Sequence, residues 1–430
     1  MDIKFYKRLE KGYDVIPPRA DNATYKSILN FSDDLAKPFQ RWCRYKEGYS
    51  LDIVEQLIKK YNQNPNGVIL DPFLGSGSTI VAANVMGLDG CGFEVNPFSF
   101  HLAQCKTRKY TAEDINILKQ HSLSILEDAK SNKIKYKMPE LSFGDKVFNK
   151  DIEAYYMRIY VCIEKLEVAE HIKSFLKLGW ISKIESFSNY RKAGNGLKMK
   201  KYKKPRPITI DKVYNELSEL YANMIADISD YSPQNSARVI NDSCLKMEQY
   251  LDKESVSGII FSPPYANCFD YTEIYKLELW FGRYIKNYDD LKELKKCSLH
   301  SHLNGNLKEQ ALKSSQYLDD LVAELKTKDL WNKRIVSMLQ LYFSDMFTVL
   351  EACYNVLEKN GFCSIIVGNS SYSNVVIPTD LLLAEYAERL GFKVDKIIVD
   401  RYIITSAQQY ESTKDYKNYL RESIVCLQKK

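Results

Sequence analysis

The sequence contains no closely spaced pair of cysteines. Its ten cysteines are scattered along 430 residues without a C-x-x-C motif, which favours reduced thiols over a disulfide framework. Cys297, His300 and His302 come nearest to a metal-binding group, but no second pair at zinc-like spacing accompanies them. We therefore expect neither a disulfide-stabilised secreted domain nor a metal site.

Long apolar segments are missing as well. No apolar run reaches the roughly 18 residues that a membrane helix needs. The first residues, MDIKFYKRLEKGYD, lack the apolar core of a signal peptide, and the chain has no internal repeat or low-complexity tract. These absences predict a cytoplasmic protein without a membrane partner. The formal net charge of +6 permits a nucleic-acid partner without requiring one.

Residues 68–98, VILDPFLGSGSTIVAANVMGLDGCGFEVNPF, have the pattern of a strand, a tight turn, a helix and a second strand. The apolar run 68–70 stops before Pro72, because proline cannot continue a central ladder. Gly75 and Gly77 bracket a turn that needs either a positive φ or a close approach of the backbone to a ligand. The stretch therefore predicts a glycine-rich loop at the end of a buried strand.

The second half of this stretch predicts where a nucleotide would bind. Ser78 or Thr79 could cap a helix over about 80–86. The following strand, 90–95, carries Glu94 near its end. Backbone N–H groups at a helix N-terminus and a carboxylate one strand later can together hold phosphate-like groups and ribose hydroxyls. We therefore expect a nucleotide-type cofactor at this place.

Residues 111–235 interrupt the alternation of strands and helices. Helices are predicted over 113–130 and 151–178, with no strand pattern between or after them. The segment 191–206, RKAGNGLKMKKYKKPR, carries eight basic residues and no acidic one. It is either a solvated charged loop or a loop that contacts phosphates. The candidate DNA contacts are Arg191, Lys192, Asn195, Lys198, Lys200 and Lys201.

Strand and helix patterns alternate again after residue 236. The predicted strands are 238–241, 256–261, 362–368, 392–400 and 422–428, and the predicted helices are 244–251, 271–281, 332–357 and 378–390. A polar segment over about 283–330 reads as an insertion. Such alternation indicates an α/β protein with a mostly parallel sheet covered on both faces. We expect three regions: 1–110 with the cofactor loop, 111–235 as an inserted target-recognition region, and 236–430 as the catalytic half.

Four polar motifs follow predicted strands, at 71–79, Glu94, Asp242 and 262–265. In open α/β sheets, ligands bind beyond the carboxyl ends of the strands. The motifs should therefore converge on one crevice that holds a cofactor and a small polar target.

The last of these motifs, Ser262-Pro263-Pro264-Tyr265, is the most informative. Two prolines fix the backbone and leave nearby carbonyl oxygens free to accept hydrogen bonds. Ser262 and the Pro263 carbonyl could accept from an exocyclic amino group, while Tyr265 stacks on the ring that carries it. The motif therefore either binds an amino group on a ring or only ends a loop, as two prolines followed by an aromatic residue commonly do.

The motifs DPFLGSGST, FEVNP and FSPPY resemble those of the S-adenosylmethionine-dependent DNA amino-methyltransferases, which modify N4 of cytosine or N6 of adenine. The resemblance covers about 38–110 and 236–430 and implies a Rossmann-like class I methyltransferase fold. That fold has a mostly parallel seven-stranded sheet with helices on both faces, here with an inserted helical or irregular DNA-recognition region. The implied catalytic residues are Ser262, Pro263, Pro264 and Tyr265. The implied residues for S-adenosylmethionine are Asp71, Pro72, Phe73, Gly75, Ser76, Gly77, Thr79, Glu94, Asn96 and, by a weaker match, Asp242.

Serine in the first position of the catalytic motif is similar to the cytosine-N4 enzymes, whereas Asp or Asn there more often marks adenine-N6. We therefore expect N4 methylation of cytosine in duplex DNA after base flipping, with adenine-N6 as the alternative. A tRNA guanine-N2 methyltransferase shares the DPF loop but usually has an acid before the two prolines. A catalytically silent nucleic-acid binder is a further alternative. The resemblance implies a prokaryotic or phage protein of a restriction-modification system, and leaves open whether a cognate restriction endonuclease is encoded nearby.

Overall fold

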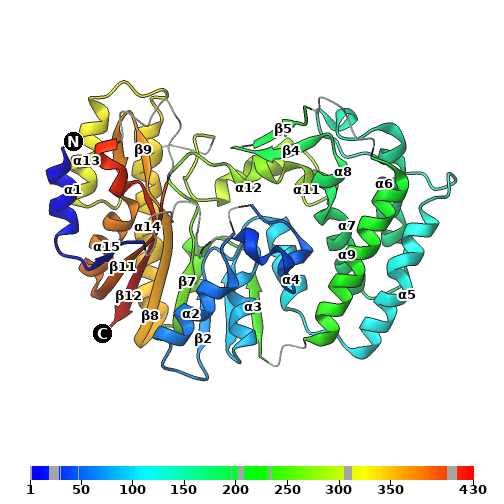
Figure 1. Cartoon of the computed structure of the whole chain (residues 1–430), viewed down its shortest axis with the longest axis horizontal. Coiled ribbons are helices and arrows are strands. Elements are labelled where there is room, and N and C mark those ends of the chain that lie inside the picture. The colour runs from blue at the N-terminus through cyan, green and yellow to red at the C-terminus, as the bar shows by residue number, and fades with distance from the viewer. Residues whose placement is uncertain are drawn as a thin grey trace.

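The computed structural model describes residues 2–18, 29, 31–46, 48–194, 196–201, 208–231, 235–304, 312–403 and 414–430. Within these residues a central sheet has the strand order β1-β11-β12-β8-β7-β2-β3-β6 (Figure 1). The strands are β1 Val15–Ile16, β2 Val68–Asp71, β3 Asp89–Phe93, β6 Ala237–Ile240, β7 Val256–Phe261, β8 Leu357–Gly368, β11 Phe392–Tyr402 and β12 Arg421–Lys429.

The sheet is mostly parallel, as expected. Neighbouring strands from β6 through β3, β2 and β7 to β8 are parallel, whereas β12 runs antiparallel to both β8 and β11. The expected number of seven strands is corrected to eight, because Val15–Ile16 adds a two-residue edge strand parallel to β11. The chain moves outward from β2 in one direction and from β7 in the other, so ligands are expected beyond this switch point.

Each face of the sheet has its own hydrophobic core. Side chains of a strand alternate between faces, so that Ile69 and Ile260 enter the core with α2 Leu51–Tyr61 and α3 Ser78–Val85. Leu70 and Ile259 enter the opposite core with α14 Ile335–Val356 and α15 Thr379–Leu390. The predicted covering of both faces is therefore confirmed.

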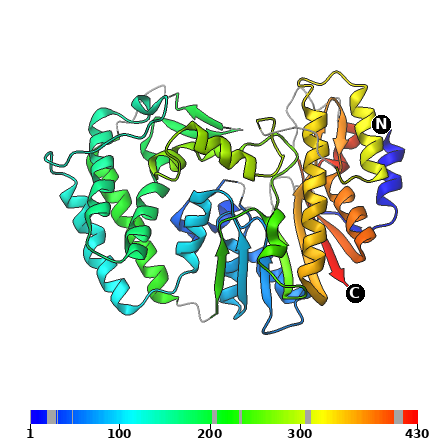
Figure 2. The ribbon, with the colours of Figure 1, turned by 180° about the vertical axis from the view of Figure 1, so that it is seen from behind.

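The interruption between the two halves forms a helical lobe beside the sheet (Figures 1 and 2). It contains α5 Ala112–Asp128, α6 Lys150–Lys165, α7 Glu170–Ser182, α8 Ile184–Phe187 and α9 Ile210–Asp230, with a hairpin of β4 Tyr190–Ala193 and β5 Gly196–Met199. The single helix expected over 151–178 is two helices, because the backbone is extended at Leu166, the C-cap of α6.

The 21-residue helix α9 was not predicted from the sequence. Its apolar side chains at Val213, Leu217, Leu220 and Met224 nevertheless have helical spacing and are buried. That periodicity was the signal that could have found it. The predicted division into three regions is compatible with this layout and stays a prediction.

The second half differs from expectation in its short elements. The helix expected over 244–251 is the 3₁₀ helix η4 Cys244–Gln249, and the one over 271–281 is split into α10 Tyr271–Ile274 and α11 Lys276–Phe281. The described part of the polar segment 283–330 holds two helices. The remaining elements are α1 Ile3–Glu10, η1 Phe31–Ala36, η2 Gln40–Trp42, α4 Pro97–Thr107, η3 Gly144–Lys146, α12 Tyr288–Cys297, α13 Gln316–Lys326, β9 Ser370–Tyr372, β10 Val375–Ile377 and η5 Lys414–Tyr419.

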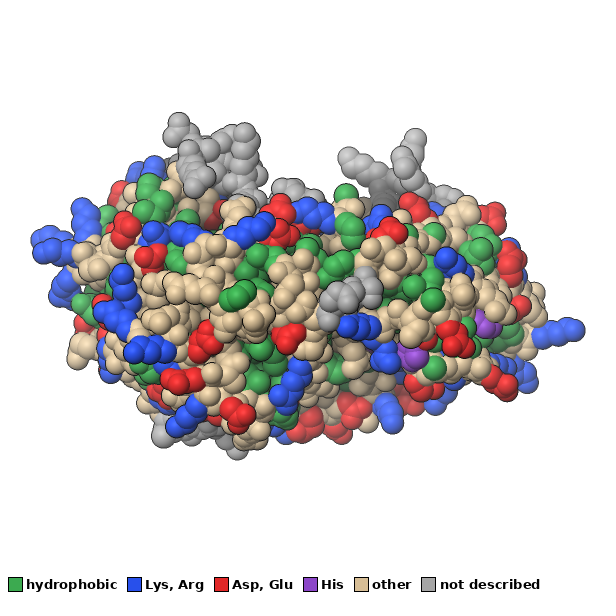
Figure 3. Space-filling view, turned by 90° about the horizontal axis from the view of Figure 1, so that it is seen from below, with side chains coloured by type: hydrophobic (Ala, Val, Ile, Leu, Met, Phe, Trp, Pro, Cys, Tyr) green, Lys and Arg blue, Asp and Glu red, His purple; other side chains and the backbone are tan. Residues whose placement is uncertain are grey.

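One face of the molecule carries mixed charge. On the face shown in Figure 3, Lys and Arg side chains are interspersed with Asp and Glu. In the described part of the chain, no helix is both long and apolar enough to cross a membrane.

Candidate active site

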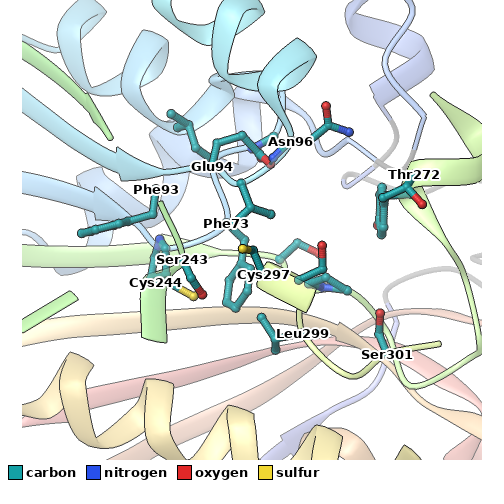
Figure 4. A pocket seen from close by; sticks show the side chains of 18 of the residues that line it. Phe73, Phe93, Glu94, Asn96, Ser243, Cys244, Thr272, Cys297, Leu299 and Ser301 are labelled. Atoms are coloured by element: carbon teal, nitrogen blue, oxygen red, sulfur yellow. Dashed lines mark hydrogen bonds between the residues drawn. The ribbon is translucent and has the colours of Figure 1, made fainter. Parts of the chain in front are cut away.

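Four strand ends meet at one edge of the sheet. Strands β2, β3, β6 and β7 are mutually parallel, and polar residues follow or end each of them, namely Asp71, Glu94, Asp242 and Ser262. A pocket lies there, lined by Glu94, Asp242 and Ser262. Figure 4 shows Glu94 and Asn96 on one side of this cofactor pocket, with Leu299 and Ser301 facing them. The structure thus brings the predicted motifs together.

Asp71 organises the glycine-rich loop from behind the pocket wall. Its carboxylate accepts a hydrogen bond from the Phe73 N–H at 2.9 Å and another from the Tyr49 hydroxyl at 2.6 Å. Burial raises the pKa of Asp71 to about 6. Asp71, Gly77 and Thr79 do not line the pocket, and their expected part in cofactor binding stays a prediction.

Glycine is required at two positions of this loop. Gly75 and Gly77 have φ values of +51° and +85°, in the left-handed region that L side chains rarely adopt. A Cβ on Gly75 would also lie 3.3 Å from Cε1 of Tyr45. Helix α3 begins at Ser78 with Gly77 as its N-cap and without a side-chain cap, so the expected capping by Ser78 or Thr79 is wrong.

Glu94 connects the loop to the neighbouring strand. Its carboxylate accepts from the Gly75 N–H at 2.8 Å and from the Asn96 N–H at 2.7 Å. Burial is the main cause that raises the pKa of Glu94 to about 7, and the two N–H groups offset part of that rise. Asn96 caps α4 and, like Pro72, Phe73 and Ser76, lines the pocket.

Asp242 also lines the pocket, but protein donors already hold its carboxylate. The Tyr250 hydroxyl donates to it at 2.6 Å and the Lys246 ammonium at 2.9 Å. These bonds, with Tyr250 first, lower the pKa of Asp242. The neighbouring Ser243 and Cys244 continue the same wall.

The far wall of the cofactor pocket comes from the segment 283–330. Leu294 and Cys297 of α12, together with Leu299, Ser301 and His302, line the pocket. Sequence reasoning considered Cys297 and His302 only as an incomplete metal-binding group, because no motif in this segment points to a nucleotide-type ligand. Among the described residues no group of three His, Cys, Asp or Glu side chains could hold a metal ion.

The chemistry of this pocket fits S-adenosylmethionine. The Glu94 carboxylate can accept from ribose hydroxyls, and the aromatic and apolar side chains of Phe73, Phe93 and Leu299 can cover a purine. The glycine-rich turn leaves room where a Cβ would approach Tyr45. The described residues that line the pocket include the carboxylates of Glu94 and Asp270 and no Lys or Arg. A cationic sulfonium would therefore meet no lysine or arginine side chain in this lining.

A second pocket adjoins the first, and we call it the target pocket. Ser262, Tyr45, Tyr49 and Tyr271 line both pockets, so Ser262 stands at the boundary between them. Tyr265 lines the target pocket and does not line the cofactor pocket.

The two prolines of the catalytic motif differ in their positions. Pro264 lines the cofactor pocket, whereas Pro263 is buried and its side chain faces neither cavity.

The basic residues of the segment 191–206 differ in their exposure to solvent. Arg191, Lys198 and Lys201 are exposed, which keeps them as candidate phosphate contacts. Asn195 lies outside the described residues, as do 202–207.

Lys192 and Lys200 have partners within the protein, Lys192 also lines the target pocket, and the phosphate contacts expected of both stay predictions. The Lys192 side chain is only 5% exposed, and its ammonium lies 2.5 Å from a Glu278 carboxylate oxygen and 3.9 Å from the centre of the Tyr275 ring. The Lys200 ammonium donates to the carbonyls of Glu185 and Ser188 at 2.7 and 2.9 Å. Both ammonium groups therefore hold the hairpin onto the protein.

The parallel sheet with helices on both faces and a ligand pocket at its switch point is a Rossmann-like class I methyltransferase fold. Residues 19–104 match the family model described as DNA methylase. The chain is similar to the Type II methyltransferase M.AvaI of Nostoc sp., with 29% identity covering 92% of this chain and 87% of the relative. It is also similar to the Type II methyltransferase M.BsoBI of Geobacillus stearothermophilus, with 25% identity covering 91% and 85%.

Among solved structures, a geranyl diphosphate methyltransferase in complex with GPP and sinefungin aligns over 98% of this chain and 93% of its own, at 6% identity and a TM-score of 0.32. The sequence matches confirm the resemblance to the S-adenosylmethionine-dependent DNA amino-methyltransferases. The family model and the two relatives thus support a DNA methyltransferase that uses S-adenosylmethionine.

Proposed function

We propose that this chain transfers the methyl group of S-adenosylmethionine to N4 of cytosine in a specific sequence of duplex DNA. The observation that carries the proposal is the position of Ser262, which lines both the cofactor pocket and the target pocket. A base in the target pocket would present its amino group to the cofactor across this residue. Serine as first residue of the motif supports cytosine, and adenine-N6 is the alternative.

The cofactor supplies an electrophilic methyl group, and the protein positions the acceptor. Extrusion of the base costs a few kcal/mol, which stacking on Tyr265 offsets. Ser262 and the Pro263 carbonyl accept the amino hydrogens and thereby direct the nitrogen lone pair toward the cofactor pocket. Alignment of the two reactants contributes most of the rate without a covalent intermediate.

The exposed hairpin residues Arg191, Lys198 and Lys201 are proposed to contact phosphates of the duplex. The relatives M.AvaI and M.BsoBI are named Type II methyltransferases, which supports a place in a restriction-modification system. A cognate nuclease encoded nearby would be a functional partner, and no physical complex is implied.

Expression in a host without DNA methyltransferases, followed by single-molecule sequencing, tests the target base and reports the recognition sequence together. We expect N4-methylcytosine at one defined sequence. N6-methyladenine would overturn the assignment of the base. Transfer of tritiated methyl groups to tRNA and not to duplex DNA would support the guanine-N2 alternative instead. DNA binding without transfer to either substrate would support a catalytically silent nucleic-acid binder.

The matched variant for this experiment is Tyr265→Ala. Because Tyr265 lines only the target pocket, the variant should bind S-adenosylmethionine with an unchanged Kd while losing most of the transferred methyl groups. Full activity of this variant would contradict the stacking role.

A further inference from the structure

The ring of Tyr265 is fixed at two points inside the target pocket. Its hydroxyl donates a hydrogen bond to a carboxylate oxygen of Glu422 at 2.6 Å. One edge of the ring packs on the backbone of Gly368, where a Cβ would lie 2.7 Å from Cε2 of Tyr265. The side chain that should stack on the base is therefore held both at its tip and along its edge.

Glu422 is itself held from the opposite side. Its side chain is 10% exposed, and its second carboxylate oxygen accepts from Nε of Arg401 at 2.7 Å. Burial raises the pKa of Tyr265, so the phenol stays protonated and donates at neutral pH. Hydrogen bonds to a charged acceptor contribute roughly twice as much as neutral ones.

The sheet register places these groups in one row. Gly368 of β8 lies opposite Glu422 of β12, and Glu422 lies opposite Arg401 of β11. Directly opposite residues on neighbouring strands are the closest side-chain pairs in a sheet. The row begins next to β7, which ends at Phe261, four residues before Tyr265. Both Glu422 and Arg401 line the target pocket.

We propose that Glu422 is a positioning residue that holds the Tyr265 ring in the orientation that stacks on the extruded base, with Arg401 holding the Glu422 carboxylate in place. The inference rests on the proposed function, since it assigns Tyr265 the task of receiving a base. The rigid ring would meet the base without rotating first. A displacement of about 1 Å in a positioned group can lower a rate about 100-fold.

The test is the single-turnover rate of tritiated methyl transfer to duplex DNA that contains the recognition sequence. It compares wild type, Glu422→Ala, Tyr265→Phe and the double variant, and the Kd for S-adenosylmethionine is measured for each. Glu422→Ala should be about 10- to 100-fold slower, with a Kd within about twofold of wild type because the cofactor pocket is untouched. In the Tyr265→Phe background the same substitution should cost less than about threefold, since the bond it removes is already absent.

A matched control lies away from both pockets. Tyr386 donates to Glu351 at 2.7 Å, and Glu351 pairs with Lys313, so Glu351→Gln perturbs the same kind of pair and should leave the rate unchanged. If Glu422→Ala fails to fold, Gly368→Ala displaces the ring from its other contact and should slow transfer about 10-fold.

Three results would overturn the inference. The first is a wild-type rate in Glu422→Ala, and the second is an equal loss in the wild-type and Tyr265→Phe backgrounds. The third is a loss of rate in Gly368→Ala and Glu422→Ala that is matched by an equally large loss of affinity for the cofactor. If wild type transfers no methyl groups to DNA, the proposed function fails and the positioning role falls with it.

Discussion

The affinity for S-adenosylmethionine is expected to fall as the pH is lowered through 7. The carboxylate of Glu94 faces the cofactor pocket and is the acceptor available to ribose hydroxyls there. Burial raises the pKa of Glu94 to about 7, even though the N–H groups of Gly75 and Asn96 donate to it. Protonation near neutral pH converts this acceptor into a donor, which a ribose hydroxyl satisfies less well.

The size of the effect follows from the pKa. A carboxyl group with a pKa of about 7 is about 90% ionised at pH 8 and about 10% ionised at pH 6, which corresponds to a roughly 10-fold weaker Kd or about 1.4 kcal/mol. The direction of the pH dependence follows from linkage between binding and protonation. Ribose hydroxyls bind the ionised form, so they lower the pKa of Glu94 in the complex. Binding therefore releases a proton near pH 7. Lowering the pH therefore opposes binding.

Isothermal titration calorimetry at pH 6, 7 and 8 measures this dependence, with Glu94→Gln as the matched variant. The variant should bind about 10-fold more weakly at pH 8, since a charge-assisted hydrogen bond is lost, and its Kd should change little with pH. Subtracting its profile removes titrations of the ligand and of Asp71, whose pKa burial raises to about 6. A constant wild-type Kd between pH 6 and 8, or an equal slope in Glu94→Gln, would refute the reasoning.

Three further predictions concern the loop, the lobe and the hairpin. Gly77→Ala should lower the free energy of unfolding in urea by about 2 kcal/mol, because the N-cap of α3 has φ +85°; a cost below about 0.5 kcal/mol would argue against strain there. Asp227→Ala should cost about 3 kcal/mol in the same assay, since this carboxylate, 2% exposed, accepts from the Phe39 N–H at 2.9 Å and the Trp42 indole at 2.8 Å; an unchanged midpoint would contradict that role. Lys198→Ala should reduce the slope of log K for DNA against log salt concentration by about 0.9, as expected for one lost phosphate contact; an unchanged slope would remove Lys198 from the interface.

Local sequence was sufficient to predict the position of polar residues that follow the ends of strands. Asp71, Glu94, Asp242 and Ser262 were placed together because carboxyl ends of parallel strands share an edge, and the alternation of elements had already indicated parallel strands. The glycine pattern likewise predicted the turn, because φ at Gly75 and Gly77 is a property of a few bonds.

Long-range packing was beyond such reasoning. Leu299 and Glu422 line the pockets from segments that carry no motif. The ion pair of Lys192 could not be predicted from the sequence either, because its partner Glu278 lies 86 residues away in the chain.

The sequence by itself predicted the class of site: a glycine-rich loop, an acid one strand later and a proline-fixed motif, all at the ends of neighbouring strands. Those features depend on backbone geometry and on residues near each other in the chain. Only the tertiary structure decided that there are two adjoining pockets with Ser262 between them, that α12 closes one, and that Glu422 and Arg401 hold Tyr265 in the other. These contacts join strands and helices from distant parts of the chain, and their partners are set by the register of the sheet.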